Sequence, residues 1–374
     1  MNGQVKSTLD LVPSLAARLK DRIAHEGPIS VQAYMEACLT DARGGYYATR
    51  QPIGSSGDFI TAPEISQIFG ELIGAWTIAV WQAMGAPSSL VIAELGPGRG
   101  TLMADAMRVF KTVPGLSDRA NIAFIETSSV LREAQRRALQ KSPLHLIWCE
   151  RLEDVPPGPL IVLANEFIDA LPVRQLLRVQ GAWYERAVGL DAKGGFVFCA
   201  GAAIENDALP PALRTIPAED GAIAETRPGA TALLETLAAR AMTAPVAALF
   251  IDYGHTSSGF GDTLQAVRGH RFADPLASPG EADLTAHADF AALKEAGQGL
   301  GLAVYGPMPQ GEFLLRLGLE SRLQRLCLNA HPEEKDMLIS GAARLADPRQ
   351  MGVLFKALAL QSSGLAPPPP FGEI

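Results

Sequence analysis

The sequence predicts an α/β fold built on an open, mostly parallel sheet of the Rossmann-like kind. One observation is the strand, glycine-rich turn and helix that follow each other within residues 90–107. Another is the alternation of apolar, strand-like runs with amphipathic segments from about residue 88 onward. The third is composition, because 48% of the 374 residues are hydrophobic and only 19% are charged, which suits a large globular core.

Helical spacing dominates the beginning of the chain. Residues 14–27 show it and stop at a glycine, and residues 28–39 form a second amphipathic stretch. Residues 44–64 are rich in Gly, Ser and Pro and are expected to form a long loop, which inside a compact protein is usually functional or flexible. The apolar run 72–87 is short for a membrane span and contains Gln82, so we expect a buried helix there.

The elements that follow alternate between the two types. Strands are expected at 90–95, 121–127, 145–150 and 158–167, and helices at 101–110 and 128–140. Residues 174–201 alternate and contain Gly turns, which predicts a β-hairpin or meander inserted into the sheet order. After an acidic, proline-containing connection come a strand at 245–254, a helix at 287–297, the segment 301–308, a helical stretch near 311–319 and an apolar segment at 351–360.

Charge and cysteine content exclude several classes of function. The net charge of -8 and the pI of about 5.4 argue against nucleic-acid or anionic-membrane binding, which needs a basic surface. The four cysteines form no CxxC pair, so we expect neither a disulfide framework nor a metal site. Residues 1–27 lack an uninterrupted apolar core and carry several acids, which predicts no signal or transit peptide and a cytoplasmic protein.

The glycine-rich turn discriminates between two kinds of cofactor. A dinucleotide fingerprint reads G-x-G-x-x-G, whereas here Gly96, Gly98 and Gly100 are spaced G-x-G-x-G and Glu94 precedes them. This pattern is typical of S-adenosylmethionine-dependent methyltransferases. The glycines would let the backbone approach a cofactor without phosphates, and Glu94 would place negative charge near its ammonium and sulfonium groups.

A second carboxylate is expected where the next strand ends. Glu126 stands at that position and would accept hydrogen bonds from both ribose hydroxyls. Each part also has a purely structural alternative. Glycine-rich turns also occur simply as turns that connect secondary-structure elements, and acids such as Glu126 favour the first turn of a helix. The register of strand, turn, helix and Glu126 favours S-adenosylmethionine.

The acceptor would lie at the end of the fourth strand. Asn165, Glu166 and Asp169 follow that strand, and ligands of open α/β sheets bind at the carboxyl ends of strands. A pair of carboxylates suits a guanidinium, which offers a planar fork of donors. The structural alternative is that Asn165 caps the strand end and Asp169 caps a short helix.

Other polar residues carry weaker predictions. Thr61 and Glu64 fit a capping box with Pro63 in the first turn, a structural role. Asp58, on the preceding loop, is freer to act as a lid residue over the site. His287 and Asp289 resemble half a metal or base site without a third ligand, although a histidine at a helix start is more often a local partner. His255, after a strand, could line the pocket.

Several stretches of the chain resemble the MidA-type methyltransferases, which include the mitochondrial complex I assembly-factor protein arginine methyltransferases. The stretches are GPISVQAYMEACL, GDFITAPEISQIFGELIGAW, ELGPGRGTLMADAMR, ANEFIDALPVRQ, IDYG, GDTLQAVRGH, PGEADLTAHADF and MGVLFKALA. The resemblance spans nearly the whole chain and is weakest between residues 190 and 240. It implies a class I methyltransferase core whose sheet is mostly parallel with an antiparallel last strand. It also implies S-adenosyl-L-methionine as donor.

The resemblance also implies site residues and a partner. Glu94, Gly96, Gly98, Gly100 and Glu126 would bind the cofactor. Asp58, Asn165, Glu166 and Asp169 would lie near the acceptor, an arginine of a protein substrate and, by analogy with the mitochondrial members, of a complex I subunit. Residues 1–84 are expected to act as a lid and residues 85–374 to form the methyltransferase domain, with an insertion at about 172–240.

Alternatives to this function come from other classes. One is an assembly or interaction protein that keeps the fold without turnover, since a fold does not dictate a function. Another is a small-molecule methyltransferase. An NAD-dependent oxidoreductase is disfavoured by the glycine spacing. The sequence leaves the oligomeric state open.

Overall fold

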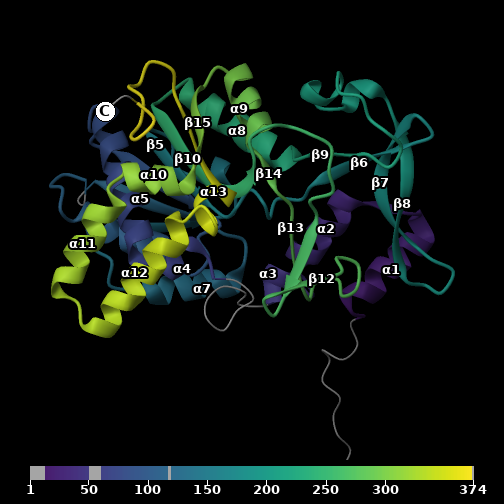
Figure 1. Cartoon of the computed structure of the whole chain (residues 1–374), viewed down its shortest axis with the longest axis horizontal. Coiled ribbons are helices and arrows are strands. Elements are labelled where there is room, and N and C mark those ends of the chain that lie inside the picture. Colours follow the sequence, from purple (N-terminus) through teal and green to yellow (C-terminus); the bar gives the residue numbers. More distant parts are fainter. Residues whose placement is uncertain (1–12, 50–59, 117–118, 373–374) are drawn as a thin grey trace, which may run out of the picture. The chain divides into compact units, whose positions relative to one another are not determined.

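The computed structural model describes residues 13–49, 60–116 and 119–372, which form two compact units (Figure 1). The meander unit contains the described residues within 1–50, 172–226 and 260–284. The parallel-sheet unit contains those within 51–171, 227–259 and 285–374. The units interleave along the chain and divide it differently from the expected boundary at residue 84. The lid role expected for residues 1–84 stays a prediction.

The meander unit combines short helices with antiparallel strands. Its helices are α1 (Leu15–Glu26), α2 (Val31–Thr40) and α3 (Tyr46–Thr49), with 3₁₀ turns at Asn206–Ala208 and Pro211–Leu213. One sheet has the order β1-β7-β6-β9 with β8 also paired to β7, and a second has the order β12-β11-β13. The strands are β1 (Ile29–Ser30), β6 (Arg174–Val179), β7 (Ala182–Leu190), β8 (Phe196–Ile204), β9 (Ile223–Thr226), β11 (Gln265–Arg268), β12 (Arg271–Ala273) and β13 (Asp283–Thr285).

Local turn chemistry explains the inserted meander. Gln180 and Gly181 join β6 to β7 with φ of 50° and 79°, the left-handed pair that a two-residue hairpin requires. Both of their amides donate to the Asp220 carboxylate at 2.9 Å. The hairpin or meander expected at 174–201 is therefore confirmed.

The parallel-sheet unit is built on eight strands. Their order is β15-β16-β10-β5-β2-β3-β4, with β14 beside β10. The first five along the chain are mutually parallel: β2 (Leu90–Leu95), β3 (Ala120–Ile125), β4 (His145–Cys149), β5 (Leu160–Asn165) and β10 (Val246–His255). The short β14 (Ala288–Asp289) also runs parallel to β10. The last strand, β16 (Phe355–Gln361), is antiparallel to both neighbours, β10 and β15 (Ala303–Pro309). The predicted sheet, mostly parallel with an antiparallel last strand, is confirmed.

The strand order reverses between β2 and β5. The chain steps outward from β2 to β3 and β4, and then returns to the other side of β2 to form β5 and β10. At such a switch point the loops after two neighbouring strands diverge and leave a crevice at their carboxyl ends. The glycine turn follows β2, and the residues Asn165 to Asp169 follow from the end of β5.

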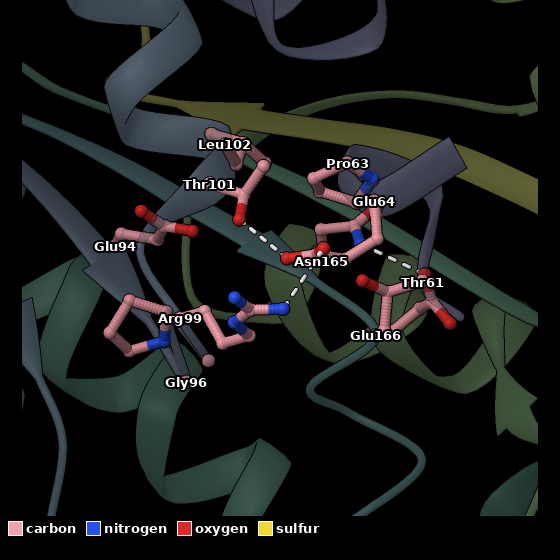
Figure 2. A pocket seen from close by; sticks show the side chains of 12 residues that line it. Thr61, Pro63, Glu64, Glu94, Gly96, Arg99, Thr101, Leu102, Asn165 and Glu166 are labelled. Atoms are coloured by element: carbon pink, nitrogen blue, oxygen red, sulfur yellow. Dashed lines mark hydrogen bonds and ion pairs between the residues drawn. The ribbon is translucent and has the colours of Figure 1, made fainter. Parts of the chain in front are cut away.

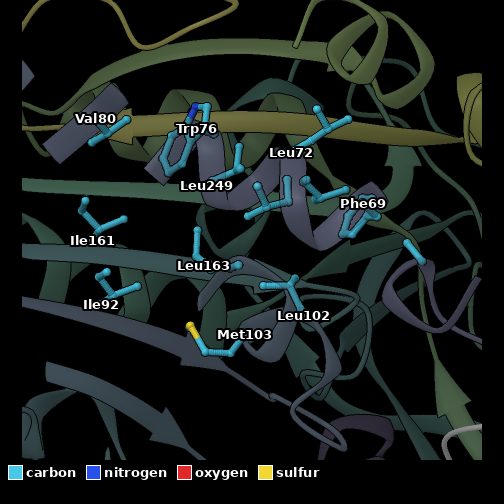
Figure 3. Packing of buried hydrophobic residues seen from close by; sticks show 14 of the residues in the cluster. Phe69, Leu72, Trp76, Val80, Ile92, Leu102, Met103, Ile161, Leu163 and Leu249 are labelled. Carbon is cyan, nitrogen blue, oxygen red and sulfur yellow. The ribbon is translucent and has the colours of Figure 1, made fainter. Parts of the chain in front are cut away.

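Helices cover both faces of this sheet. On one face, α5 (Gln67–Ala83) and α6 (Thr101–Phe110) contribute Phe69, Trp76 and Met103 to a core shared with the strands (Figure 3). On the other face, α8 (Pro228–Ala241) and α9 (Phe290–Gly299) contribute Leu234 and Phe290. The helices also include α4 (Ala62–Ile65), α7 (Ser129–Ala138), α10 (Gln310–Arg316), α11 (Leu319–Asn329), α12 (Pro332–Ala346) and α13 (Met351–Leu354), with a 3₁₀ turn at Leu152–Asp154.

Residues 72–83 of the apolar run 72–87 lie in α5, whose buried side chains confirm a core helix. Within the described ranges, no helix combines the length and apolar character needed to cross a lipid bilayer.

Some helices escape the sequence prediction. Helix α8 lies where only an acidic connection is expected, and α11 and α12 extend well beyond the helical stretch near 311–319. In α8 the buried positions Ala230, Leu234 and Leu237 have helical spacing and Pro228 occupies the first turn, a position that proline tolerates. The many alanines on its other positions blur the contrast between the two faces, which hides the period.

Candidate functional site

The glycine turn after β2 has a backbone that only glycine adopts readily. Gly96, Gly98 and Gly100 have φ of 57°, 53° and 82°, all in the left-handed region. A Cβ on Gly96 would also lie 2.9 Å from Cδ2 of Phe167. The turn therefore lets the backbone come close to whatever lies above it, and α6 starts directly after Gly100.

A pocket opens beside this turn (Figure 2). It encloses about 380 Å³ of space, part of it open to solvent, and is formed by the end of β2, the glycine turn, the start of α6, α4 and the end of β5. Of the predicted site residues it brings together Glu94, Gly96, Gly98, Asn165 and Glu166. Gly100, Glu126 and Asp169 are outside its lining.

Glu94 is a buried carboxyl with an unused acceptor. The residue is 4% exposed, and its Oε2 has no hydrogen-bond partner within the described part of the chain. Burial raises the pKa of Glu94 well above its ordinary value. An unpaired buried carboxylate is costly, so a cationic or hydrogen-bond-donating ligand in this pocket would supply the missing partner. The residues present thus fit a cofactor that carries an ammonium group.

Glu126 belongs to a small buried network that reaches the glycine turn. Its Oε1 accepts from the Ser128 amide at 2.7 Å, and its Oε2 lies 3.4 Å from Gln135 Nε2. The same Gln135 Nε2 donates to the Gly98 carbonyl at 2.8 Å, while Gln135 Oε1 accepts from Trp148 Nε1 at 2.9 Å. Gln135 therefore fixes Glu126 relative to the glycine turn.

Sequence reasoning missed Gln135. Leu131 and Gln135 are four residues apart and are the buried positions of α7, whose other side chains are more exposed. A glutamine on the apolar stripe of an amphipathic helix was the available signal, since a buried amide needs partners.

The end of β5 holds Glu166 in an unusual conformation. Its φ of 51° is left-handed, which is uncommon for a residue with a side chain and is found mostly where surrounding contacts enforce it. The Glu166 amide donates to the Ile251 carbonyl at 2.9 Å, and its Oε1 accepts from the Ala62 amide at 2.9 Å and from Asn165 Nδ2 at 3.1 Å. Burial raises the pKa of Glu166 to about 7. Asn165 Oδ1 has no partner in the described chain.

Two more carboxyls lie next to Glu166. The Asp169 amide donates to Asp252 Oδ2 at 3.1 Å, and the Tyr253 amide donates to Asp252 Oδ1 at 2.8 Å. Asp169 Oδ1 has no partner among the described residues. Burial raises the pKa of Asp169 and, together with the negative charge of Asp169, raises that of Asp252. We call Glu166, Asp169 and Asp252 the carboxyl cluster. It is suited to a cation with several donors.

Asp252 is the member that sequence reasoning did not single out. It lies near the end of β10, within the apolar run 246–255, and is fully buried. An acid inside a buried strand was the signal, because charged residues are almost never fully buried without a partner or a function. Asp169 does not begin a helix, so its expected structural alternative as a helix cap is not found.

The capping box expected at Thr61 and Glu64 is wrong. Thr61 precedes α4, but its side chain makes no capping hydrogen bond. The Glu64 carboxylate instead accepts from Thr101 Oγ1 at 2.5 Å and lies 3.6 Å from Arg99 Nη1 (Figure 2). The Glu64 carboxylate is thus bound by a hydroxyl at the start of α6 and a guanidinium of the glycine turn, and not by the local backbone. Glu64 links α4 to that turn.

Among the remaining candidates, Asp58 lies outside the described residues. The others have local roles. Asp289 caps α9 by accepting from the Ala292 amide at 2.9 Å, and His255 Nε2 lies 3.5 Å from the other Asp289 oxygen. The His287 ring packs edge-on against Tyr253. In residues 13–49, 60–116 and 119–372, no three His, Cys, Asp or Glu side chains are grouped so as to hold a metal ion.

Comparison with known proteins identifies the family. Residues 72–308 match the family described as "Putative S-adenosyl-L-methionine-dependent methyltransferase". The chain is 37% identical to the mitochondrial protein arginine methyltransferase NDUFAF7 homolog of Drosophila melanogaster, over 94% of this chain and 86% of that protein. It is 36% identical to the mitochondrial protein arginine methyltransferase NDUFAF7 of Homo sapiens, over 93% of this chain and 83% of that protein.

Solved structures agree with this match. A likely methyl transferase from Burkholderia thailandensis, crystallised with bound S-adenosyl-homocysteine, is 31% identical to this chain with a TM-score of 0.80. The match covers 94% of this chain and 92% of that one. A native crystal structure of a protein of the same superfamily and organism gives a TM-score of 0.79 at 30% identity, with the same coverage. The chain belongs to the S-adenosyl-L-methionine-dependent methyltransferase family, and S-adenosyl-L-methionine is its cofactor.

Proposed function

We propose that this methyltransferase modifies arginine: it is a protein arginine N-methyltransferase linked to the assembly of respiratory complex I. The carboxyl cluster at the ends of β5 and β10, beside the pocket at the glycine turn, is the observation that carries the proposal. Relatives over 35% identical across most of the chain bear the name protein arginine methyltransferase, which supports it.

On the donor side, Glu94, Gly96, Gly98, Gly100 and Glu126 would hold the cofactor. S-adenosyl-L-methionine supplies an electrophilic methyl group when it is bound. Glu94 contributes the unpaired Oε2 for a cationic group, and the glycines allow close approach of the backbone. Glu126 would accept from ribose hydroxyls, held in place by Gln135.

On the acceptor side, Glu166 and Asp169 would hold the guanidinium, with Asn165 as a further acceptor through its unpartnered Oδ1. Carboxylates that bind one end of a guanidinium draw its positive charge toward them and leave the opposite nitrogen richer in electrons. Catalysis would then come from orientation of this nitrogen and from electrostatic positioning. Asp58 would also lie near the acceptor.

The proposal extends to partner and compartment. The acceptor would be a protein that presents an arginine, with a subunit of complex I as the candidate, in keeping with the family resemblance. The net charge of -8 is compatible with a basic segment of such a protein. The chain would act in the cytoplasm, with residues 1–84 acting as a lid.

The substitution Glu166→Gln tests the acceptor assignment. It keeps the size and hydrogen-bonding capacity of the side chain but removes the charge that would hold the guanidinium. We expect methyl transfer to arginine in a protein extract to fall by at least about a hundredfold, as losses of oriented charged groups do. The Kd for S-adenosyl-homocysteine, measured by calorimetry, should stay nearly unchanged.

The matched control is Glu235→Gln, which changes an exposed carboxylate on α8. It should leave both quantities unaltered. Loss of cofactor binding in Glu166→Gln would instead move Glu166 to the donor side and contradict the assignment.

A further inference from the structure

A second pocket in the parallel-sheet unit contains two lysines. It contains about 1070 Å³ of space, part of it open to solvent, and lies among the residue after β10, helix α9 and the strands β15 and β16. Lys294 of α9 and Lys356 of β16 line it, together with Thr256 and Gln298. Nothing in the proposed methyl transfer uses these residues.

Two neighbouring strands, β10 and β16, connect this pocket to the carboxyl cluster. Lys356 is the direct ladder partner of Asp252, so their Cβ atoms are about 5 Å apart on the same face. That face is the one covered by α8 and α9, since Phe250 and Leu358 both belong to its core. Asp252 in turn accepts the amide of Asp169. The lysines and the proposed guanidinium site are therefore neighbours at one edge of the sheet.

The two lysines have different roles in the pocket. Lys356 is only 9% exposed, and its ammonium donates to the carbonyls of Gly254, Val353 and Leu354, so it is fixed and fully occupied. Lys294 Nζ donates to the Gly306 carbonyl at 3.1 Å. An ammonium has three N–H donors, which leaves two on the partly exposed Lys294 for a ligand. Lys294 is the residue able to bind.

The net charge of the residues that line the lysine pocket favours an anion with a single negative charge. Two lysines and the exposed Glu295 give the lining one excess positive charge. Thr256 and Gln298 add neutral polar groups. A single carboxylate matches this excess and can accept from an ammonium and from neutral donors at once.

We propose that this pocket binds a carboxylate of the protein substrate, close in sequence to the arginine that is methylated. The inference rests on the proposed function, because it makes the lysine pocket a specificity subsite beside the guanidinium site. A carboxyl cluster alone attracts any cationic segment. The adjacent lysine adds the requirement that the segment also carry an acid.

Strand geometry gives the expected spacing. Thr256 is five residues beyond Ile251, which pairs with Asn165. At roughly 3.3 Å per extended residue, Ile251 beside the guanidinium site and Thr256 in the lysine pocket are roughly 16 Å apart. An extended peptide covers that distance in about four or five residues, so the acid should stand at about that separation from the arginine.

The test uses synthetic peptides with one arginine in a neutral background, each with one glutamate placed one to six residues to either side. Each has a twin with glutamine at that place. Binding to the full chain saturated with S-adenosyl-homocysteine is followed by fluorescence anisotropy. The glutamate peptide of the right spacing should bind about fivefold more tightly than its twin. A second set of peptides ends in a free or an amidated C-terminus. It shows whether the carboxylate that binds the pocket belongs to a side chain or to the end of the peptide.

Variants assign the preference to Lys294. Lys294→Met should abolish the difference between glutamate and glutamine peptides, and Lys294→Arg, which keeps the charge, should retain it. Lys141→Met is the matched control. It removes an exposed lysine just before β4 begins, at the opposite edge of the sheet, and should leave the preference intact.

Two results overturn the proposal. One is equal binding of every glutamate peptide and its twin, with no preference for a free C-terminus. The other is a preference that survives Lys294→Met. Because binding is measured without turnover, a preference that depends on Lys294 would stand even if arginine methylation were refuted. Methylation without any acid preference would refute the subsite alone.

Discussion

At the scale of single residues, the site is defined by carboxyls whose environment departs from what their sequence position suggests. Glu94 has an unpaired oxygen, Glu166 has a left-handed backbone, and Asp169 and Asp252 share one buried region. The sequence located three of these four, because strand ends can be read from apolar runs. Asp252 and Gln135 stand out in the sequence only as polar residues at apolar positions, and their roles come from contacts with residues far away in the chain.

The ionisation of Glu166 sets a pH dependence. Burial raises its pKa to about 7, so the free enzyme carries mostly neutral Glu166 below that pH. Only the carboxylate can hold a guanidinium by charge, and binding the cation would lower the pKa. We expect kcat/KM for the arginine substrate to rise as pH increases through about 7. A pH profile that stays flat from pH 6 to 8, a window chosen as roughly one unit either side of that pKa, would contradict this role.

Gln135 gives a second prediction at this scale. Gln135→Leu removes the hydrogen bonds to Gly98 and Glu126 while filling a similar volume. Groups left without a partner cost about 1–3 kcal/mol, so the Kd for S-adenosyl-homocysteine should rise by about tenfold or more. Gln140→Leu, an exposed glutamine just after α7, is the control for calorimetry. Unchanged affinity in Gln135→Leu would mean that the network does not position the donor site.

At the scale of elements, periodicity shows where prediction succeeds. The buried parallel strands are continuous apolar runs bounded by turn residues, so β2, β3, β5 and β10 could be recognised. Helix α8 was missed because its alanines blur the apolar face. The four-residue helix α4 is held by Glu166 and Glu64 at long range, and its local sequence suggested a capping box that does not form.

The contact between α5 and α6 depends on two glycines. A Cβ on Gly70 would lie 2.6 Å from Asp105 Cβ, and one on Gly74 would lie 2.9 Å from Ala106 Cα. Gly74→Ala should therefore destabilise the parallel-sheet unit by about 1–3 kcal/mol, although alanine is the better helix former. Gly229→Ala is the control in α8, where the nearest atom would be at an ordinary 3.7 Å. Urea midpoints that shift equally in both variants would refute the close packing of these helices.

At the scale of the whole molecule, the strand order brings the two halves of the site together. The reversal between β2 and β5 places the glycine turn next to Asn165 and Glu166, two segments that are about seventy residues apart in the sequence. The spacing of the glycines and the family resemblance predicted the fold and the cofactor. The interleaving of the two compact units could not be predicted, because it depends on long-range strand pairing such as β1 with β7.

Ligand-linked stability follows from this architecture. A ligand that binds the folded chain alone stabilises it by about 2.7 kcal/mol at a concentration of a hundred times its Kd. S-adenosyl-homocysteine should therefore raise the Tm of the transition that reports the parallel-sheet unit, and NAD⁺ should not. A rise with NAD⁺ alone would contradict the interpretation of the glycine turn.

The most direct test of arginine methylation identifies the methylated amino acid. The purified methyltransferase is incubated with radiolabelled S-adenosyl-L-methionine and a protein extract from cells that lack this methyltransferase. The labelled proteins are then hydrolysed to amino acids. Label in methylated arginine, absent with Glu166→Gln, is the predicted result. Label that appears only in small molecules, or in a protein residue other than arginine, would contradict the proposed function.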